Sequence, residues 1–280
     1  LNRRGRTAKV APVPSDLRHT PLHEIHRTLG ARMVPFTGWE MPVQYSGVTD
    51  EHRAVRHAVG LFDVSHMGEL HFEGPNAGAC LDSLVTNDVS RLPVGRALYT
   101  VACNARGTIL DDLIIYRLAE SHYLVVCNAS NLDKMREHFA RHALGRCQFS
   151  DRSDSTALLA LQGPRASELV QVLGAVQLAA LPRFGVTEGE LAGIPIVAAR
   201  TGYTGEDGYE LFCSSEEVLV ELTHLDLLAA VAIGVAANFA LRPPEPRDVT
   251  LAALCASIPV PVPTPLFDPQ SYMELEGRFS

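Results

Sequence analysis

The segment from residue 99 to residue 131 constrains the fold more than any other part of the chain. It holds three runs rich in β-branched and aromatic residues, and polar turn residues separate them. Runs of this composition and spacing are typical of neighbouring strands joined by short turns, so the segment predicts a β-meander. Elsewhere strands and helices are expected to mix without strict alternation. We therefore predict an α+β fold in which helices flank antiparallel sheets.

Two adjacent carboxylates, Asp111 and Asp112, stand just before the apolar residues 113–115 of the meander. Successive side chains of a strand point to opposite faces, so the two aspartates cannot both face the interior. We expect one to face solvent or cap a turn and the other to be drawn inward, where a carboxylate needs a hydrogen-bond partner or a cationic ligand. A solvated turn is the commoner explanation of an isolated Asp-Asp pair, and a binding site is the alternative.

Apolar spacing and turn residues predict the remaining elements. The strand at 156–161 is uniformly apolar and should be buried. Glycines between residues 201 and 208 permit the positive φ angles of a tight connection. Helices are expected at residues 20–30 with Thr20 as N-cap, at 48–59, 76–84 and 165–173, and after Asn131 as N-cap; further strands are expected at 33–36, 61–65, 70–73, 194–199 and 209–213.

Composition along the chain predicts three regions. Residues 1–18 are expected to be an unstructured extension, although their basic charge could also belong to an organellar leader. Residues 19–240 should form the folded region, as two interleaved α+β subdomains, approximately 60–145 and the rest. Residues 241–280 form an atypical tail, because eight of the chain's 18 prolines lie between Pro243 and Pro269. Such proline density prevents regular structure.

Charge and cysteine spacing exclude several classes of protein. A net charge of −8 argues against a nucleic-acid-binding protein, which normally has a basic face. No apolar run approaches the roughly 20 residues that span a bilayer. The six cysteines lack metal-binding spacing, so we expect free, reduced thiols and a cytoplasmic location. His138 and His142 lie four residues apart without an evident third ligand, and we expect a solvated helix face and no metal.

Five motifs occur in order along the chain, and together they resemble a known family. They are Gly38-Trp39-Glu40-Met41-Pro42, His66-Met67-Gly68 after Phe62-Asp63-Val64-Ser65, the Asp111-Asp112 pair in its meander, Leu161-Gln162-Gly163-Pro164, and the segment from Arg200 to Glu210. From about Thr20 to Phe212 this pattern resembles the T protein of the glycine cleavage system, a tetrahydrofolate-dependent aminomethyltransferase. The resemblance implies the folate-binding cloverleaf fold of that family, truncated before its C-terminal β-domain.

The resemblance also implies a reaction, its substrates and a partner. Members of the family transfer a methylene group from an aminomethyl-lipoyl arm, carried by the H protein, to tetrahydrofolate, and release ammonia. Asp112 corresponds to the essential carboxylate, which stabilises positive charge as N5 of the folate attacks. The location would be the cytoplasm, or the mitochondrial matrix in a eukaryote, and no metal, nucleic acid or membrane is implied. The other positions that match folate-binding residues are Met67, Tyr99, Asn128, Tyr203, Glu210 and Arg247.

Three departures from the family pattern leave an alternative open. Thr108 follows Gly107 where the family usually has Gly-Gly, and a positive φ would strain this β-branched residue. Arg183-Phe184 occupies the region of a family tyrosine, and the proline-rich tail replaces the C-terminal domain, through truncation or a shifted reading frame. The alternative is a non-catalytic folate-binding or truncated relative. Relatives acting in tRNA or iron–sulfur metabolism carry a Lys-Gly-Cys-Tyr-x-Gly-Gln segment, which this sequence lacks.

Overall fold

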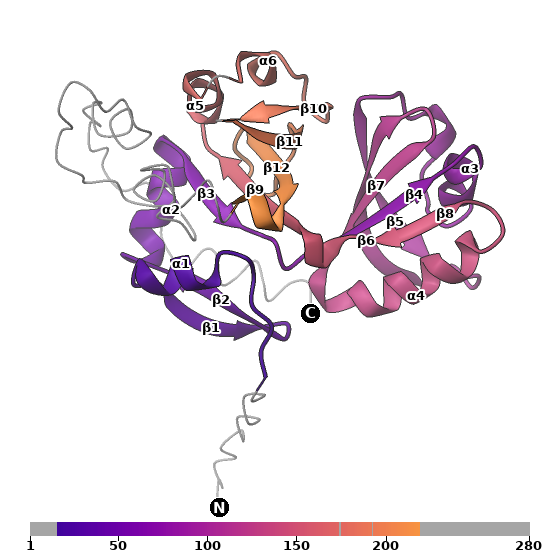
Figure 1. Cartoon of the computed structure of the whole chain (residues 1–280), viewed down its shortest axis with the longest axis horizontal. Helices are drawn as coiled ribbons and strands as arrows, with labels where there is room; N and C mark the ends of the chain where they lie inside the picture. The colour runs from indigo at the N-terminus through magenta and orange to yellow at the C-terminus, as the bar shows by residue number, and fades with distance from the viewer. Residues whose placement is uncertain (1–15, 174, 192, 219–280) are drawn as a thin grey trace, which may run out of the picture.

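The predicted meander forms three neighbouring strands, including one edge strand, of a five-stranded antiparallel sheet. The computed structural model describes residues 16–173, 175–191 and 193–218. In this meander sheet the strand order is β5-β6-β7-β4-β8 (Figure 1). Its strands are β5 (Arg96–Cys103), β6 (Ile109–Ala119), β7 (His122–Cys127), β4 (Gly68–Glu73) and β8 (Gln148–Asp151).

A second five-stranded antiparallel sheet lies beside the meander sheet. Its strand order is β10-β11-β12-β9-β3. Strand β9 lies inside this sheet and is buried along almost its whole length, as its apolar sequence predicts. Edge strand β10 was not predicted, because its Thr-Glu-Gly-Glu sequence is polar and contains a glycine. The strands are β10 (Val186–Leu191), β11 (Ile194–Ala199), β12 (Gly208–Ser214), β9 (Thr156–Gln162) and β3 (Gly60–Asp63).

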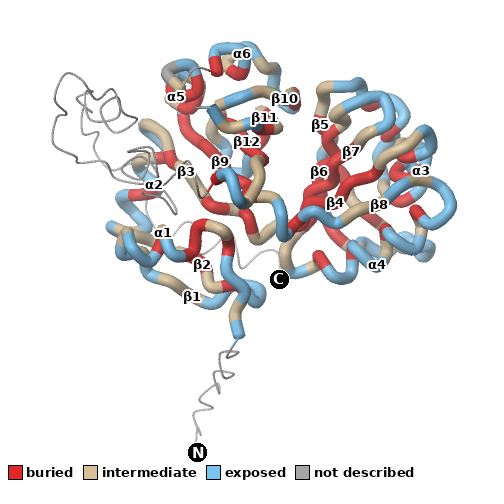
Figure 2. The backbone as a smooth tube through the Cα atoms, in the orientation of Figure 1, coloured by how far each residue is buried: buried red, intermediate tan, exposed pale blue. Residues whose placement is uncertain are grey.

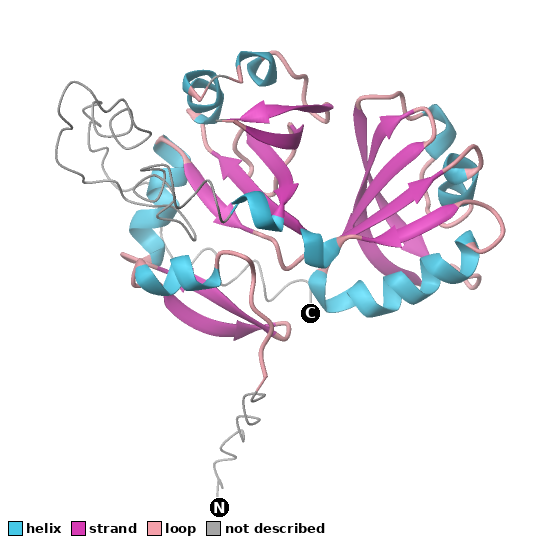
Figure 3. Ribbon diagram, in the orientation of Figure 1, coloured by secondary structure: helices cyan, strands magenta, loops and turns pink. Residues whose placement is uncertain are grey.

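Helices α3 to α6 lie on the outer faces of the two sheets, whereas α1 and α2 lie beside a separate hairpin of β1 and β2 (Figure 1 and Figure 3). The helix expected at 20–30 begins only at His23, and residues 39–42 of the first family motif belong to β2. Together these elements confirm the α+β prediction. The remaining bounds are α1 (His23–Thr28), β1 (Arg32–Phe36), β2 (Trp39–Gln44), α2 (Val48–His57), α3 (Ala77–Asp82), α4 (Leu132–Ala143), α5 (Ala166–Val172) and α6 (Val176–Ala179), with 3₁₀ turns η1 (Val89–Arg91), η2 (Ala129–Asn131) and η3 (Ser153–Ser155).

Three apolar layers hold these elements together (Figure 2). Helices α3 and α4 pack on one face of the meander sheet, and α5 and α6 pack on the second sheet. The third group, which we call the inter-sheet layer, joins the remaining faces of the two sheets. On β6 the residues alternate between layers, with Leu113 and Ile115 facing the helices and Ile114 and Tyr116 facing the second sheet. The inter-sheet layer consists of Ala97, Ile114, Tyr116, Leu124, Val126, Leu158, Val186, Ala199 and Phe212, with Val64, Met67, Leu118 and Val197 packed against it.

Two predicted boundaries move in the structure. The meander sheet spans residues 68–151 rather than starting near 60, because β3 pairs with β9 in the second sheet. Ordered structure begins before residue 19, because Arg18 forms a bridge with Trp39 and places its guanidinium 4.1 Å from the indole centroid. Residues 1–15 and the tail 241–280, including Arg247 and Cys255, lie outside the described residues. The five described cysteines are free, and no described helix is long and apolar enough to cross a membrane.

Candidate functional site

Strand β6 turns its two aspartates to opposite faces. Asp111 lies on the face that also carries the helix-packed Leu113 and is only 3% exposed. Asp112 lies on the opposite face, toward the second sheet, and is exposed. The prediction that one aspartate of the pair is drawn inward is confirmed, and the inward one is Asp111.

The buried aspartate is fully occupied by structural hydrogen bonds. Asp111 accepts hydrogen bonds from the backbone N–H and the side-chain Nδ2 of Asn128, both at 2.9 Å, and from Nδ2 of Asn131. These donors satisfy the buried carboxylate without a bound cation. Asn131 does occupy the N-cap position of α4, but the predicted side-chain cap is wrong. Its amide donates to Asp111 instead and makes no cap bond.

The exposed aspartate is held from two sides. The hydroxyl of Tyr99 donates to Oδ2 of Asp112 at 2.8 Å, and Nδ2 of Asn128 lies 3.1 Å from Oδ1. The hydrogen bond to Asp112 raises the pKa of Tyr99, so the hydroxyl remains a donor at neutral pH. The pairing of Leu113 with Cys127 across β6 and β7 brings Asn128 beside Asp112. Strand register therefore orients a solvent-accessible carboxylate.

A second carboxylate, Glu210 on β12, lies on the facing sheet. It is 5% exposed and accepts hydrogen bonds from the hydroxyl of Tyr116, at 2.8 Å, and from the hydroxyl of Thr201. Burial raises the pKa of Glu210, although both hydrogen bonds oppose the shift. Burial, followed by the charge of Glu210, raises the pKa of Tyr116 well above its usual range. The Tyr116–Glu210 bond links β6 to β12 across the inter-sheet layer.

The connection at residues 200–208 is fixed by an ion pair and a close glycine contact. Arg200 donates to both carboxylate oxygens of Asp207, and the Nε–Oδ1 distance is 2.9 Å. Gly202 lies against Gln162, where an added Cβ would be 2.0 Å from Oε1. A side chain larger than hydrogen cannot occupy this position without displacing Gln162. The connection therefore holds the intervening residues in one place.

This connection brings Tyr203 to the same end of the sheets. The ring of Tyr203 is 66% exposed, and partial desolvation followed by the charges of Glu210 and Asp112 raises its pKa. Its hydroxyl is thus within electrostatic range of both carboxylates. Met67 packs against the inter-sheet layer. Five of the positions predicted from the sequence therefore lie together at this end of the sheets. Asp112, Asn128 and Tyr99 come from the meander sheet, and Tyr203 and Glu210 come from the second sheet and its connection. Arg247 lies outside the described residues.

Two polar contacts at this site were missed from the sequence. Tyr116 lies four residues after Asp112 on one strand, so the two-residue period of a strand could have placed both on one face. Thr201 gave no comparable signal. Its contact with Glu210 depends on the register that pairs Glu210 with Ala199 across β11 and β12.

The Gly107-Thr108 pair, which stands where the family usually has Gly-Gly, causes no backbone strain in the structure. Gly107 takes a positive φ of +75°, and the only described non-glycine residues with positive φ are Thr37 and Phe184. Thr108 therefore does not take the positive φ that would strain a β-branched residue. Phe184, in the region of the family tyrosine, is 37% exposed and takes φ +58°.

The aspartate pair belongs to no cluster of metal-binding side chains in the described chain. Side chains that could share a cation occur as two groups elsewhere, and His138 and His142 are in neither. The two groups are His19, His23 and Glu40, and His71, Glu73 and His122.

These features define an α+β protein with two antiparallel sheets. An oriented carboxylate, a buried carboxylate and tyrosine side chains converge at one end of its inter-sheet layer. The model of the GCVT N-terminal domain matches residues 22–236. The chain belongs to this family.

Relatives and a solved structure agree with this assignment. The chain is 48% identical over 234 residues to an aminomethyltransferase of Rubrobacter xylanophilus, covering 83% of this chain and 63% of the relative. It is 50% identical over 209 residues to that of Symbiobacterium thermophilum, covering 72% and 56%. The crystal structure of glycine cleavage system aminomethyltransferase T from Bartonella henselae has a TM-score of 0.68 at 36% identity, covering 76% of this chain and 58% of that one. The chain thus spans under two thirds of the length of these relatives.

Proposed function

We propose that this chain is an aminomethyltransferase of the glycine cleavage system. The carbon it transfers leaves the sulfur and nitrogen of an aminomethyl-lipoyl arm and becomes bonded to N5 and N10 of tetrahydrofolate. The arm departs as a thiol and the nitrogen as ammonia. The observation that carries this proposal is the exposed carboxylate of Asp112, fixed by Tyr99 and Asn128 at the end of the inter-sheet layer.

Asp112 is the catalytic residue of this proposal. Positive charge develops on the reacting carbon and nitrogen as the donor is attacked, and a carboxylate already in place stabilises it without reorganisation. The two donors hold the carboxylate in one orientation, which an exposed aspartate would not otherwise keep. Tyr99 and Asn128 therefore act as positioning residues.

The polar and aromatic groups around Asp112 suit a reduced folate. A pterin presents flat faces, which the exposed ring of Tyr203 and the thioether of Met67 can contact. Its N–H groups are donors, and Glu210 offers acceptor oxygens beside the Tyr116 and Thr201 hydroxyls. We assign Glu210 and Tyr203 to binding the pterin.

The proposal names one protein partner and one compartment. The methylene donor would be delivered on the lipoyl arm of the H protein, so the open side of Asp112 must admit that arm. Five free described thiols favour a reducing compartment, and we place the reaction in the cytoplasm. No metal takes part in the proposed chemistry.

A folate-binding protein without turnover is the second candidate. The chain covers 63% of the first relative and 56% of the second, so the similarity does not by itself extend the whole activity of those relatives to this chain. The two candidates share the folate site and differ in whether bound folate then accepts the methylene carbon. Binding and turnover must therefore be measured separately.

Calorimetry with tetrahydrofolate and a turnover assay with aminomethyl-loaded H protein separate these outcomes. Both candidates predict saturable binding that weakens about tenfold in Tyr203→Ala, because an aromatic contact is lost. Leu144→Ala is the control, since Leu144 is 84% exposed on a different element. Methylenetetrahydrofolate formation supports the enzyme, and binding without product supports the second candidate. A folded wild type that binds no folate contradicts both.

A further inference from the structure

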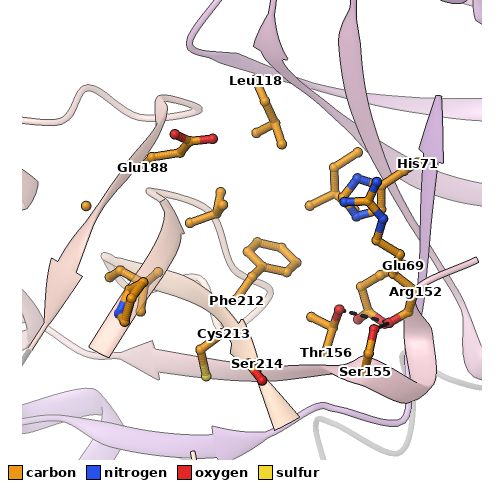
Figure 4. A pocket seen from close by; sticks show the side chains of 15 residues that line it. Glu69, His71, Leu118, Arg152, Ser155, Thr156, Glu188, Phe212, Cys213 and Ser214 are labelled. Carbon is orange, nitrogen blue, oxygen red and sulfur yellow. Dashed lines mark hydrogen bonds between the residues drawn. The ribbon is translucent and has the colours of Figure 1, made fainter. Parts of the chain in front are cut away.

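A cavity of about 500 Å³ lies between the two sheets, away from the aspartate pair (Figure 4). Leu118 of β6 lines it, and Leu118 is six residues from Asp112 on the same strand face. Leu118 thus lies roughly 20 Å from Asp112 along the strand, at about 3.4 Å per residue, whereas Glu69 lies closer, because Val126 pairs with both Glu69 and Ile114. None of Asp112, Asn128, Tyr99, Tyr203 and Glu210 lines the cavity. Its size falls within the range of small-molecule pockets. The cavity is therefore a second candidate site.

The walls of the cavity are mainly apolar. Side chains from both sheets form them, and the ring of Phe212 lies in the middle of the view in Figure 4. Strand β4 supplies a polar wall through Glu69 and His71. The apolar lining residues are Leu118, Leu124, Pro195, Ile196, Val197 and Phe212.

Glu69 is the unusual group in this wall. It is 0% exposed, and within the described chain neither of its carboxylate oxygens has a hydrogen-bond partner. Its backbone, in contrast, is fully bonded, since the Ser153 hydroxyl accepts from its N–H and its carbonyl accepts from the N–H of Arg152. A buried carboxylate without donors is costly, so a site that presents one to a cavity is suited to a ligand that donates.

The charges around Glu69 favour a cationic ligand. Burial, followed by the negative charges of Asp151 and Asp154, raises the pKa of Glu69. The guanidinium of Arg152 also lines the cavity, but it is paired with Glu73. Three other titratable groups line the cavity: Glu188 on β10, His71 on β4 and the thiol of Cys213 on β12.

His71 adds no positive charge to this wall. Burial, then Arg152 and His122, lowers the pKa of His71 to about 3, so it is neutral at physiological pH. Its Nδ1 lies 2.9 Å from Nε2 of His122. Asp151 and Asp154 are paired with Arg136 and Arg18, so Glu69 is the buried acid of this wall that has no partner in the described chain.

We propose that this cavity binds a small aliphatic amine, whose ammonium group pairs with Glu69 while its hydrocarbon body packs against Phe212 and the neighbouring apolar side chains. The two lining carboxylates, Glu69 and Glu188, come from different sheets, and neither belongs to a described group of side chains that could share a cation, whereas a divalent cation needs four or more ligands. An ammonium group needs only a few acceptors and carries its own apolar body. This site is separate from the folate site and goes beyond the proposed function.

Calorimetry with cyclohexylamine tests the proposal on the full chain. Cyclohexanol is the matched neutral ligand, because it has the same ring without the charge. We expect saturable binding of the amine and none of comparable strength for the alcohol. Glu69 is protonated in the free protein below its raised pKa and ionised in the complex, so amine binding should release up to one proton. Repeating the titration in buffers of different ionisation enthalpy measures that proton.

Two variants locate the binding. Glu69→Gln should weaken amine binding at least about tenfold, because a charge-assisted bond is lost. Glu137→Gln is the matched control, since Glu137 is an exposed glutamate of α4 that does not line the cavity. No saturable amine binding, equal binding of the alcohol, or unchanged affinity in a folded Glu69→Gln would overturn the proposal. If Glu69→Gln does not fold, the comparison of amine and alcohol in the wild type decides, and equal binding of the two overturns the proposal.

Discussion

Replacing Asp111 by asparagine should destabilise the protein more than the same change at Asp112. Asp111 is 3% exposed and accepts three hydrogen bonds from Asn128 and Asn131. An asparagine puts an NH₂ group where one carboxylate oxygen accepts, so at least one buried donor then faces another donor. Each unsatisfied buried group costs about 1–3 kcal/mol, and we expect about 2–4 kcal/mol in total. Asp112 is exposed, and its replacement should change stability by only about 0.5 kcal/mol.

Thermal unfolding of wild type, Asp111→Asn and Asp112→Asn measures this contrast. For a folded region of about 200 residues, each kcal/mol shifts Tm by roughly 2–4 °C, so Asp111→Asn should lower Tm by about 4–16 °C. Asp112→Asn should stay within about 2 °C of the wild type. Equal shifts for the two variants would refute the assignment of Asp111 to a buried, structural role.

Three further outcomes are expected from the contacts described above. Tyr116→Phe removes a hydrogen-bond donor to Glu210, so it should lower the free energy of unfolding in urea by about 1 kcal/mol and weaken folate binding. An unchanged folate Kd would show that Glu210 does not take part in folate binding. Gly202→Ala should lower Tm, because the added Cβ would lie 2.0 Å from Oε1 of Gln162. An unchanged Tm would show that the connection at residues 200–208 shifts without cost to make room for the methyl group. Because burial raises the pKa of Glu69 above 4.5, the wild type should lose stability relative to Glu69→Gln as pH rises from about 4.5, and parallel Tm–pH curves would contradict this.

The sequence predicted the features that depend on local periodicity. The two-residue period of a strand separates Asp111 from Asp112, and the apolar run of β9 identifies a buried strand. The sequence did not predict contacts that depend on the register between strands that are distant along the chain. The amide of Asn131 donates to Asp111 across 20 residues, and this bond replaces the cap that the local sequence predicts.

Two edge strands of the sheets were likewise not predicted from the sequence. Strands β8 and β10 carry polar residues, so composition alone does not distinguish them from loops. Their partners, β4 and β11, supply the pairing that makes them strands. Whether the gathered side chains bind folate is a matter of chemistry that neither periodicity nor register decides.

The turnover of Asp112→Asn tests the central claim most directly. The assay is methylenetetrahydrofolate formation from aminomethyl-loaded H protein at saturating tetrahydrofolate, with the wild type as reference. If Asp112 stabilises developing positive charge, its isosteric neutral replacement should lower kcat about 10²–10³-fold while folate affinity and Tm stay close to wild type. A kcat within about threefold of the wild type, in a variant that binds folate and folds normally, would contradict the claim.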